Sequence, residues 1–209
     1  RSFLKLFPQT AVITSVDPDH LDIYGAGEQL VDSFIAFANQ VSNTLIIKQG
    51  LALPESIYSK ATSYHTSLPA DVRLENYVLR GDTYVFDVLV YGEYIRGIEL
   101  GLPGFHNVEN ALAAIAVAHK HGLSADEIKA SLSSFKGVKR RFEYIIRRAD
   151  LIYIDDYAHH PEELKACIQS VKKIYPGKKV TGVFQPHLFS RTRDFMDGFA
   201  SSLSLLDEV

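Results

Sequence analysis

Five polar or titratable side chains follow one apolar run in the last third of the chain: Asp155, Asp156, Tyr157, His159 and His160. Residues 151–154, Leu-Ile-Tyr-Ile, predict a buried strand, because short runs of β-branched and aromatic residues are typical of strands. Pro161, followed by two glutamates, predicts the first turn of a helix. Ligands of open α/β sheets bind beyond the carboxyl ends of the strands. This turn is therefore predicted to act in acid–base chemistry, to ligate a metal or to hold an anion.

The same residues also admit a purely structural interpretation. His160 could cap the helix while His159 is a solvated turn residue, and Asp156 could be a turn carboxylate. Two compact cationic groups, Lys139–Arg141 and Arg191–Arg193, favour ligand binding, because the arginine fork grips phosphate or carboxylate with two hydrogen bonds. Each group alone would normally be explained as solvated charge. Both flank the histidine turn, so together they predict an anionic ligand.

Two further groups have the residue types of a metal or nucleotide site. His20 lies among three aspartates, at positions 17, 19 and 22, and carboxylate oxygens are the usual ligands of Mg²⁺. Asn107 and Asn110 lie one helical turn apart and can present amide donors and acceptors together. The alternatives are ordinary loop carboxylates for the first group and a helix N-cap for Asn107.

Composition bounds the partners of the protein. The chain has 209 residues, 46% of them hydrophobic, and a net charge of -3, which argues against a broad basic face for nucleic acid. No apolar run approaches the roughly 20 residues of a membrane-spanning helix, and no secretory signal is evident. The single cysteine, Cys167, excludes an intramolecular disulfide and a multi-cysteine metal site. We therefore expect a cytoplasmic protein with no nucleic-acid partner and no membrane insertion.

The elements that position these residues alternate between strands and helices. The pattern predicts strands at 11–16, 45–47, 151–154 and 180–184, and helices at 30–41, at 108–121 and after a capping box at 124–127. Residues 72–100 predict an antiparallel meander, in which Arg80-Gly-Asp82 is a hairpin turn rather than an adhesion tripeptide. The last two strands and the helix between them predict a right-handed βαβ unit.

Several motifs, in this order along the chain, resemble those of the Mur ligases. They are His-Asn-Val-Glu-Asn (106–110), Lys-Arg-Arg-Phe-Glu (139–143), Asp-Asp-Tyr-Ala-His-His-Pro (155–161), and Gln-Pro-His (185–187) with Ser-Arg-Thr-Arg-Asp (190–194). The resemblance covers essentially the whole chain and is greatest to the branch that joins L-alanine to UDP-N-acetylmuramate. The murein tripeptide ligases are the alternative, because they share the aspartate–histidine turn. Their second loop typically lacks counterparts of Gln185, His187 and Arg191.

The resemblance implies an α/β fold in two parts. Residues 1–136 would be the C-terminal portion of a mixed-sheet, P-loop-type ATPase domain that carries the meander. Residues 137–209 would be the first portion of a Rossmann-like C-terminal domain. The active site would lie in the cleft between the two, which would close around ATP at a hinge near Gly137. The chain begins at Arg1 without a methionine and ends within an apolar pattern, so we expect it to be a piece of a longer protein.

The resemblance further implies an ATP-dependent amide ligase of peptidoglycan synthesis. Its substrates would be ATP, UDP-N-acetylmuramate and L-alanine, and its cofactor Mg²⁺. The implied catalytic residues are Arg141, His159 and Arg191; the implied ATP-binding residues are Asn107, Asn110, Arg141, Asp156 and Tyr157; the implied substrate-binding residues are His159, His187 and Arg191; and the implied metal ligand is His20.

The sequence departs from the family pattern in the phosphate-binding loop. No Gly-x-x-x-x-Gly-Lys-[Ser/Thr] occurs in the chain, and the N-terminal UDP-binding domain of the family has no counterpart here. We therefore expect the isolated chain to be inactive. A non-catalytic module that binds a nucleotide or an anion is the alternative that this departure favours.

Overall fold

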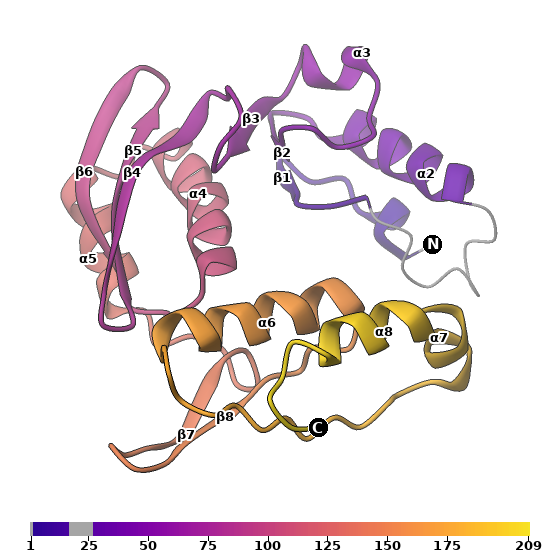
Figure 1. Ribbon diagram of the computed structural model, residues 1–209. Helices are drawn as coiled ribbons and strands as arrows, with labels where there is room; N and C mark the ends of the chain where they lie inside the picture. The colour runs from indigo at the N-terminus through magenta and orange to yellow at the C-terminus, as the bar shows by residue number, and fades with distance from the viewer. Residues whose placement is uncertain (1, 17–26) are drawn as a thin grey trace. The chain divides into compact units, whose positions relative to one another are not determined.

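The computed structural model describes residues 2–16 and 27–209, which form two compact units (Figure 1). The first unit comprises the residues up to Val78, together with Val85–Glu99 and Val108–Ser133. The second unit comprises Leu79–Tyr84, Leu100–Asn107 and Ser134–Val209. The metal ligand expected at His20 lies outside the described residues.

A six-stranded sheet spans the first unit in simple sequence order. Its strands are β1 (Thr10–Ile13), β2 (Thr44–Lys48), β3 (Thr62–His65), β4 (Val72–Arg80), β5 (Thr83–Val90) and β6 (Glu93–Leu100). The first four strands run parallel, with Ala11 opposite Leu45. The sequence did not predict β3, because only Tyr64 in this short strand is buried and no alternating pattern results. The mixed α/β fold class is confirmed.

The predicted meander forms the second half of this sheet. Two-residue turns reverse the chain between β4 and β5 and between β5 and β6, and each contains a glycine with positive φ, Gly81 (64°) and Gly92 (90°). Glycine suits these positions because it lacks the Cβ that disfavours this backbone region. Alternate residues of β5 are buried, from Tyr84 to Val90, as expected for a strand with one face on the core.

Helices cover the sheet of the first unit. They are α2 (Gly27–Gln40), the single turn α3 (Glu55–Tyr58), α4 (Phe105–Lys120) and α5 (Ala125–Ser134), with a 3-10 helix, η1, at Ser2–Lys5. Helix α2 buries Ala38 in one apolar cluster with Leu45 and Ile47 of β2. Helix α4 lies beside the meander (Figure 1), where its His119 ring lies 5.2 Å from that of Tyr91. The Asn107 N-cap was not found: α4 begins at Phe105, and the Asn107 amide donates to the carbonyl of Pro103 at 2.7 Å.

The capping box that begins α5 is confirmed. Glu127 Oε2 accepts from the Ser124 hydroxyl at 2.7 Å and from the Ser124 N–H at 2.8 Å, and these hydrogen bonds lower the pKa of Glu127 below its usual 4.5.

The contribution of the Glu127 carboxylate to stability should be complete above about pH 4.5 and lost as the pH falls through the lowered pKa. Ser124→Ala should move the titration midpoint of Glu127, followed by carbon-13 NMR, back toward 4.5. An unchanged midpoint would contradict this assignment.

The second unit combines two short strands with one long helix and two short ones. Its elements are the strands β7 (Glu143–Arg147) and β8 (Ile152–Asp155) and the helices α6 (Pro161–Ile174), α7 (Phe189–Asp194) and α8 (Met196–Leu203). Helices α6 and α8 lie side by side (Figure 1). The Ser202 hydroxyl on α8 donates to the Pro161 carbonyl at 2.9 Å, which fixes α8 against the first turn of α6.

Two expectations for the second unit were wrong. The strand before the histidine turn is not buried: β8 pairs antiparallel with β7, and Tyr153 is 52% exposed. The predicted strand at 180–184 is absent from the described structure, so the βαβ unit does not form there. A strand requires a neighbour that pairs along its length, whereas the backbone hydrogen bonds of Val180 and Gly182 go to Asp207 and Glu208 at the C-terminal end.

Candidate functional site

Two loops of the second unit meet at the aspartate–histidine turn. The Tyr157 N–H donates to the Arg140 carbonyl at 2.7 Å. The Asp156 carboxylate accepts from the Phe142 N–H through one oxygen and from the Ala158 N–H through the other, each at 2.8 Å. Asp156 is therefore a turn carboxylate, as the structural interpretation predicted, and it also ties the basic loop to the turn. Each oxygen retains a further lone pair, so the carboxylate can also accept from a ligand.

The basic loop presents its arginines to the ring of Tyr157. The guanidinium carbon of Arg140 lies 4.6 Å from the ring centroid, and that of Arg141 lies 5.9 Å away. Both are within the range of a cation–π contact. Arg141 also lies 3.5 Å from a Glu163 oxygen, yet its side chain is 50% exposed. An exposed planar guanidinium held by one weak ion pair remains able to bind phosphate oxygens.

The two adjacent histidines are held in opposite tautomers. His159 Nδ1 lies 2.8 Å from the Tyr157 carbonyl, which can only accept, so this nitrogen carries the proton. His160 Nδ1 faces the Glu162 N–H at 3.4 Å, which can only donate, so this nitrogen is the acceptor. His160 is the N-cap of α6 and packs against Phe195 at 4.9 Å between ring centroids. The capping interpretation thus applies to His160, whereas His159 is free to present Nε2 to a ligand.

The segment that contains the second basic group, Arg191–Arg193, is followed by Phe195, which contacts the histidine turn. Arg191 lies in α7 and is buried, with 8% of its surface exposed. Its carbonyl accepts from the N–H of Phe195, whose ring contacts His160. His187 is exposed, and no contact joins it to the Tyr157 ring or to His159 within the described part of the chain. Leu188, which precedes α7, has a positive φ of 65°.

The predicted adenine-binding residues lie in the first two turns of α4. Asn107 is bonded to the Pro103 carbonyl, and Asn110 is exposed. Between them, Glu109 forms an ion pair at 2.9 Å with Lys48, at the carboxyl end of β2. His65, at the end of β3, has a lowered pKa because burial disfavours its charged form, while nearby Glu109 opposes and Lys48 adds to this effect.

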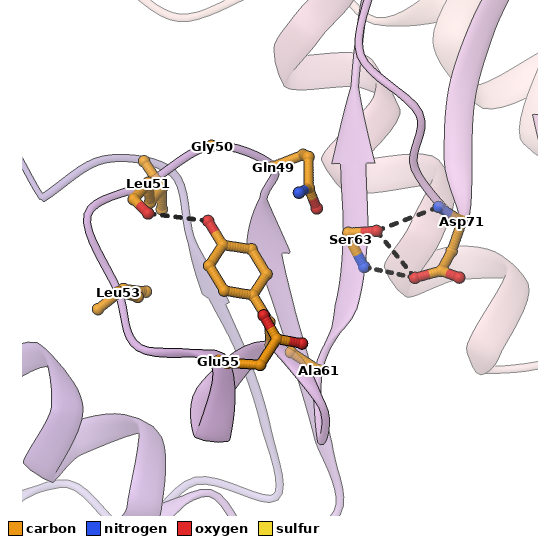
Figure 2. A pocket seen from close by; sticks show the side chains of 9 residues that line it. Gln49, Gly50, Leu51, Leu53, Glu55, Ala61, Ser63 and Asp71 are labelled. Atoms are coloured by element: carbon orange, nitrogen blue, oxygen red, sulfur yellow. Dashed lines mark hydrogen bonds between the residues drawn. The ribbon is translucent and has the colours of Figure 1, made fainter.

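An open cavity of about 320 Å³ lies beside the end of β2 in the first unit (Figure 2). Its lining residues are Gln49, Gly50, Leu51, Leu53, Glu55, Tyr58, Ala61, Ser63 and Asp71. Hydrogen bonds join several of these residues to one another: the Ser63 N–H and hydroxyl donate to Asp71, and the Tyr58 hydroxyl donates to the Leu51 carbonyl. None of the predicted site residues that the structure describes lines this cavity, so it has no part in the predicted site.

Sequence reasoning missed one member of the turn. Glu163, in the first turn of α6, accepts from the His159 N–H at 3.0 Å and lies near Arg141. Its place as the third residue of α6 is the signal that could have identified it, because a glutamate there commonly accepts from a backbone N–H at the start of the helix. In the described ranges, no group of three or more His, Cys, Asp or Glu side chains is arranged to hold a metal ion. Within the same ranges, no helix has the length and apolar character needed to cross a membrane.

The fold and its motifs define a member of a known enzyme family. Residues 2–118 match the model of the Mur ligase middle domain, and residues 140–209 match that of the Mur ligase glutamate ligase domain. The chain therefore belongs to the Mur ligase family.

The proteins similar to this chain include UDP-N-acetylmuramate–L-alanine ligases. The chain is 47% identical over 209 residues to UDP-N-acetylmuramate–L-alanine ligase of Flavobacterium johnsoniae, and 48% identical over 212 residues to that of Cytophaga hutchinsonii. Each comparison covers 100% of this chain and 46% of the relative. The crystal structure of UDP-N-acetylmuramate–alanine ligase MurC from Thermotoga maritima matches 99% of this chain and 46% of that chain, with 27% identity and a TM-score of 0.82. The chain thus spans about half the length of these relatives.

Proposed function

We propose that this chain is the part of an ATP-dependent ligase that handles ATP and the amino acid, and that the whole protein joins L-alanine to UDP-N-acetylmuramate. The observation that carries the proposal is the cluster of Arg141, Tyr157 and His159. This cluster lies in a chain that is 47% identical to a UDP-N-acetylmuramate–L-alanine ligase. The cluster offers a cation for phosphate oxygens and an imidazole acceptor for an amine. An ATP-dependent amide ligase needs both groups.

The proposed reaction has two steps. The γ-phosphoryl group of ATP passes to the carboxylate of UDP-N-acetylmuramate, giving an acyl phosphate and ADP. The L-alanine amine then attacks the acyl carbon, and inorganic phosphate leaves as the amide forms. Positioning and charge neutralisation are the main contributions that a protein can make to such a transfer.

Residues of this chain can be assigned to those needs. We assign Arg141 to the ATP phosphates, where its exposed guanidinium is available. Asp156 and Tyr157 would contact the nucleotide, and Asn107 with Asn110 would contact its adenine. His159, His187 and Arg191 would bind the amino acid, with His159 and Arg191 also acting in catalysis together with Arg141. The Mg²⁺ that family members typically use is assigned to His20, and we place the protein in the cytoplasm.

The test is a phosphate-release assay on the complete protein with ATP, UDP-N-acetylmuramate and single amino acids. We expect release that requires both UDP-N-acetylmuramate and L-alanine. Release with murein tripeptide in place of L-alanine would identify the recycling ligase instead. Binding of ATP without release under any of these conditions would leave only a nucleotide-binding module.

A further inference from the structure

Glu163 contacts both functional groups of the turn through a single carboxylate. Its Oε2 accepts from the His159 N–H at 3.0 Å and lies 3.4 Å from His159 Nδ1. Its Oε1 lies 3.5 Å from the Arg141 guanidinium. One oxygen therefore faces the imidazole and the other faces the arginine.

This arrangement has a chemical consequence for His159. Nδ1 donates to the Tyr157 carbonyl at 2.8 Å and has a carboxylate oxygen nearby, so both neighbours favour a proton on this nitrogen. In the neutral ring, Nε2 must then carry a lone pair. A carboxylate behind the protonated nitrogen of an imidazole fixes the tautomer and the orientation of the ring.

The same carboxylate limits the motion of Arg141. The long arginine side chain is 50% exposed, and in the described structure its charged group is held by Glu163 and by the ring of Tyr157. Holding the guanidinium near the turn lowers the entropy lost when an anion binds.

We infer that Glu163 is a positioning residue that presents the Nε2 lone pair of His159 and the guanidinium of Arg141 to one ligand at the same time. This inference rests on the proposed function, in which Arg141 meets a phosphate and His159 meets the amine. The inference adds Glu163 to the proposed site as a residue that acts on the ligand only through His159 and Arg141. The pairing of an acceptor with a cation suits an ammonium group that gives a proton to Nε2 and then attacks, as the amine, a phosphorylated carboxylate.

The first test reads the tautomer in the 209-residue chain, without any reaction. Long-range nitrogen-15 NMR at pH 8, where an ordinary imidazole is neutral, should show His159 as one form with the proton on Nδ1. In Glu163→Ala, the spectrum should shift toward exchange between the two tautomers. Glu162→Gln is the matched control, because Glu162 lies in the same helical turn and its side chain contacts neither His159 nor Arg141 in the described structure. An unchanged His159 spectrum in Glu163→Ala would overturn the positioning role.

The second test is kinetic and uses the complete protein. Glu163→Gln keeps an acceptor for the His159 N–H but removes the charge, and we expect kcat/KM for L-alanine to fall about ten- to a hundredfold, by analogy with loss of the carboxylate behind a metal-bound imidazole. Glu163→Asp should recover part of this loss, and Glu162→Gln should stay within twofold of the wild type. If the wild type is active and Glu163→Gln matches Glu162→Gln, the inference fails while the proposed function stands. If the wild type itself releases no phosphate, the proposed function fails, and the NMR result alone decides the role of Glu163.

Discussion

Replacing Arg141 by alanine in the complete protein should lower kcat about a hundredfold or more, because one preorganised donor to a developing charge contributes about that much. The side chain is half exposed and makes one long ion pair, so its removal should leave the fold intact. Its position beside the Tyr157 ring and the His159 turn is what makes it the candidate for the ATP phosphates. The measurement is phosphate release at saturating ATP, UDP-N-acetylmuramate and L-alanine.

Arg148→Ala is the matched control for this experiment. Arg148 belongs to the same unit and is also an exposed arginine in an ion pair, but its partner is Asp150, in the turn between β7 and β8. We expect kcat of Arg148→Ala to remain within about twofold of the wild type. Equal rates for Arg141→Ala and Arg148→Ala would remove Arg141 from the phosphate site. A circular dichroism spectrum of each variant separates loss of activity from loss of structure.

Phe86→Ala should be among the most destabilising single changes in the first unit. Phe86 lies in the middle of β5, between β4 and β6, and is 1% exposed. Truncation of a buried phenylalanine removes its burial energy and leaves a cavity, at a cost of about 3–5 kcal/mol. Because the free energy of unfolding of a domain is about 5–15 kcal/mol, this change should greatly lower the urea concentration at which the first unit unfolds.

Tyr94→Ala separates burial from strand propensity. Tyr94 lies on the neighbouring strand β6, but it is 52% exposed. Its removal should cost about 1 kcal/mol or less, since only strand propensity and a surface contact with Arg96 are lost. Urea unfolding followed by circular dichroism measures both variants. Similar midpoints for Phe86→Ala and Tyr94→Ala would contradict the assignment of Phe86 to the core.

Prediction from sequence succeeded where local signals decide the structure. The meander could be predicted because glycine-containing turns and alternating burial are encoded within a few residues of each other. The capping box at Ser124 is local for the same reason. Pairing between distant segments is not encoded in this way. The antiparallel partner of β8 was missed, and the apolar run at 180–184 resembled a strand although its backbone groups bond to the C-terminal end.

The same distinction applies to the candidate site. The types and spacing of Asp156, Tyr157 and His159 were sufficient to single out the turn, and its proximity to Arg140 follows from a backbone hydrogen bond that no pattern indicates. The protonated nitrogen of each histidine depends on which backbone group lies opposite, so it could not be predicted before the turn was seen. The role of His187, which is exposed, stays a prediction.

The bonds that Asp156 makes to Phe142 and Ala158 reach main-chain N–H groups only. The carboxylate therefore holds the two segments through their backbones, and a proline at either position would remove one of these bonds outright. Phe142 itself is 3% exposed, so its side chain anchors the basic loop in the core while its N–H anchors the same loop to the turn. Substitution of the aspartate would remove both of its bonds at once, whereas the hydrogen bond from the Tyr157 N–H to the Arg140 carbonyl would stay.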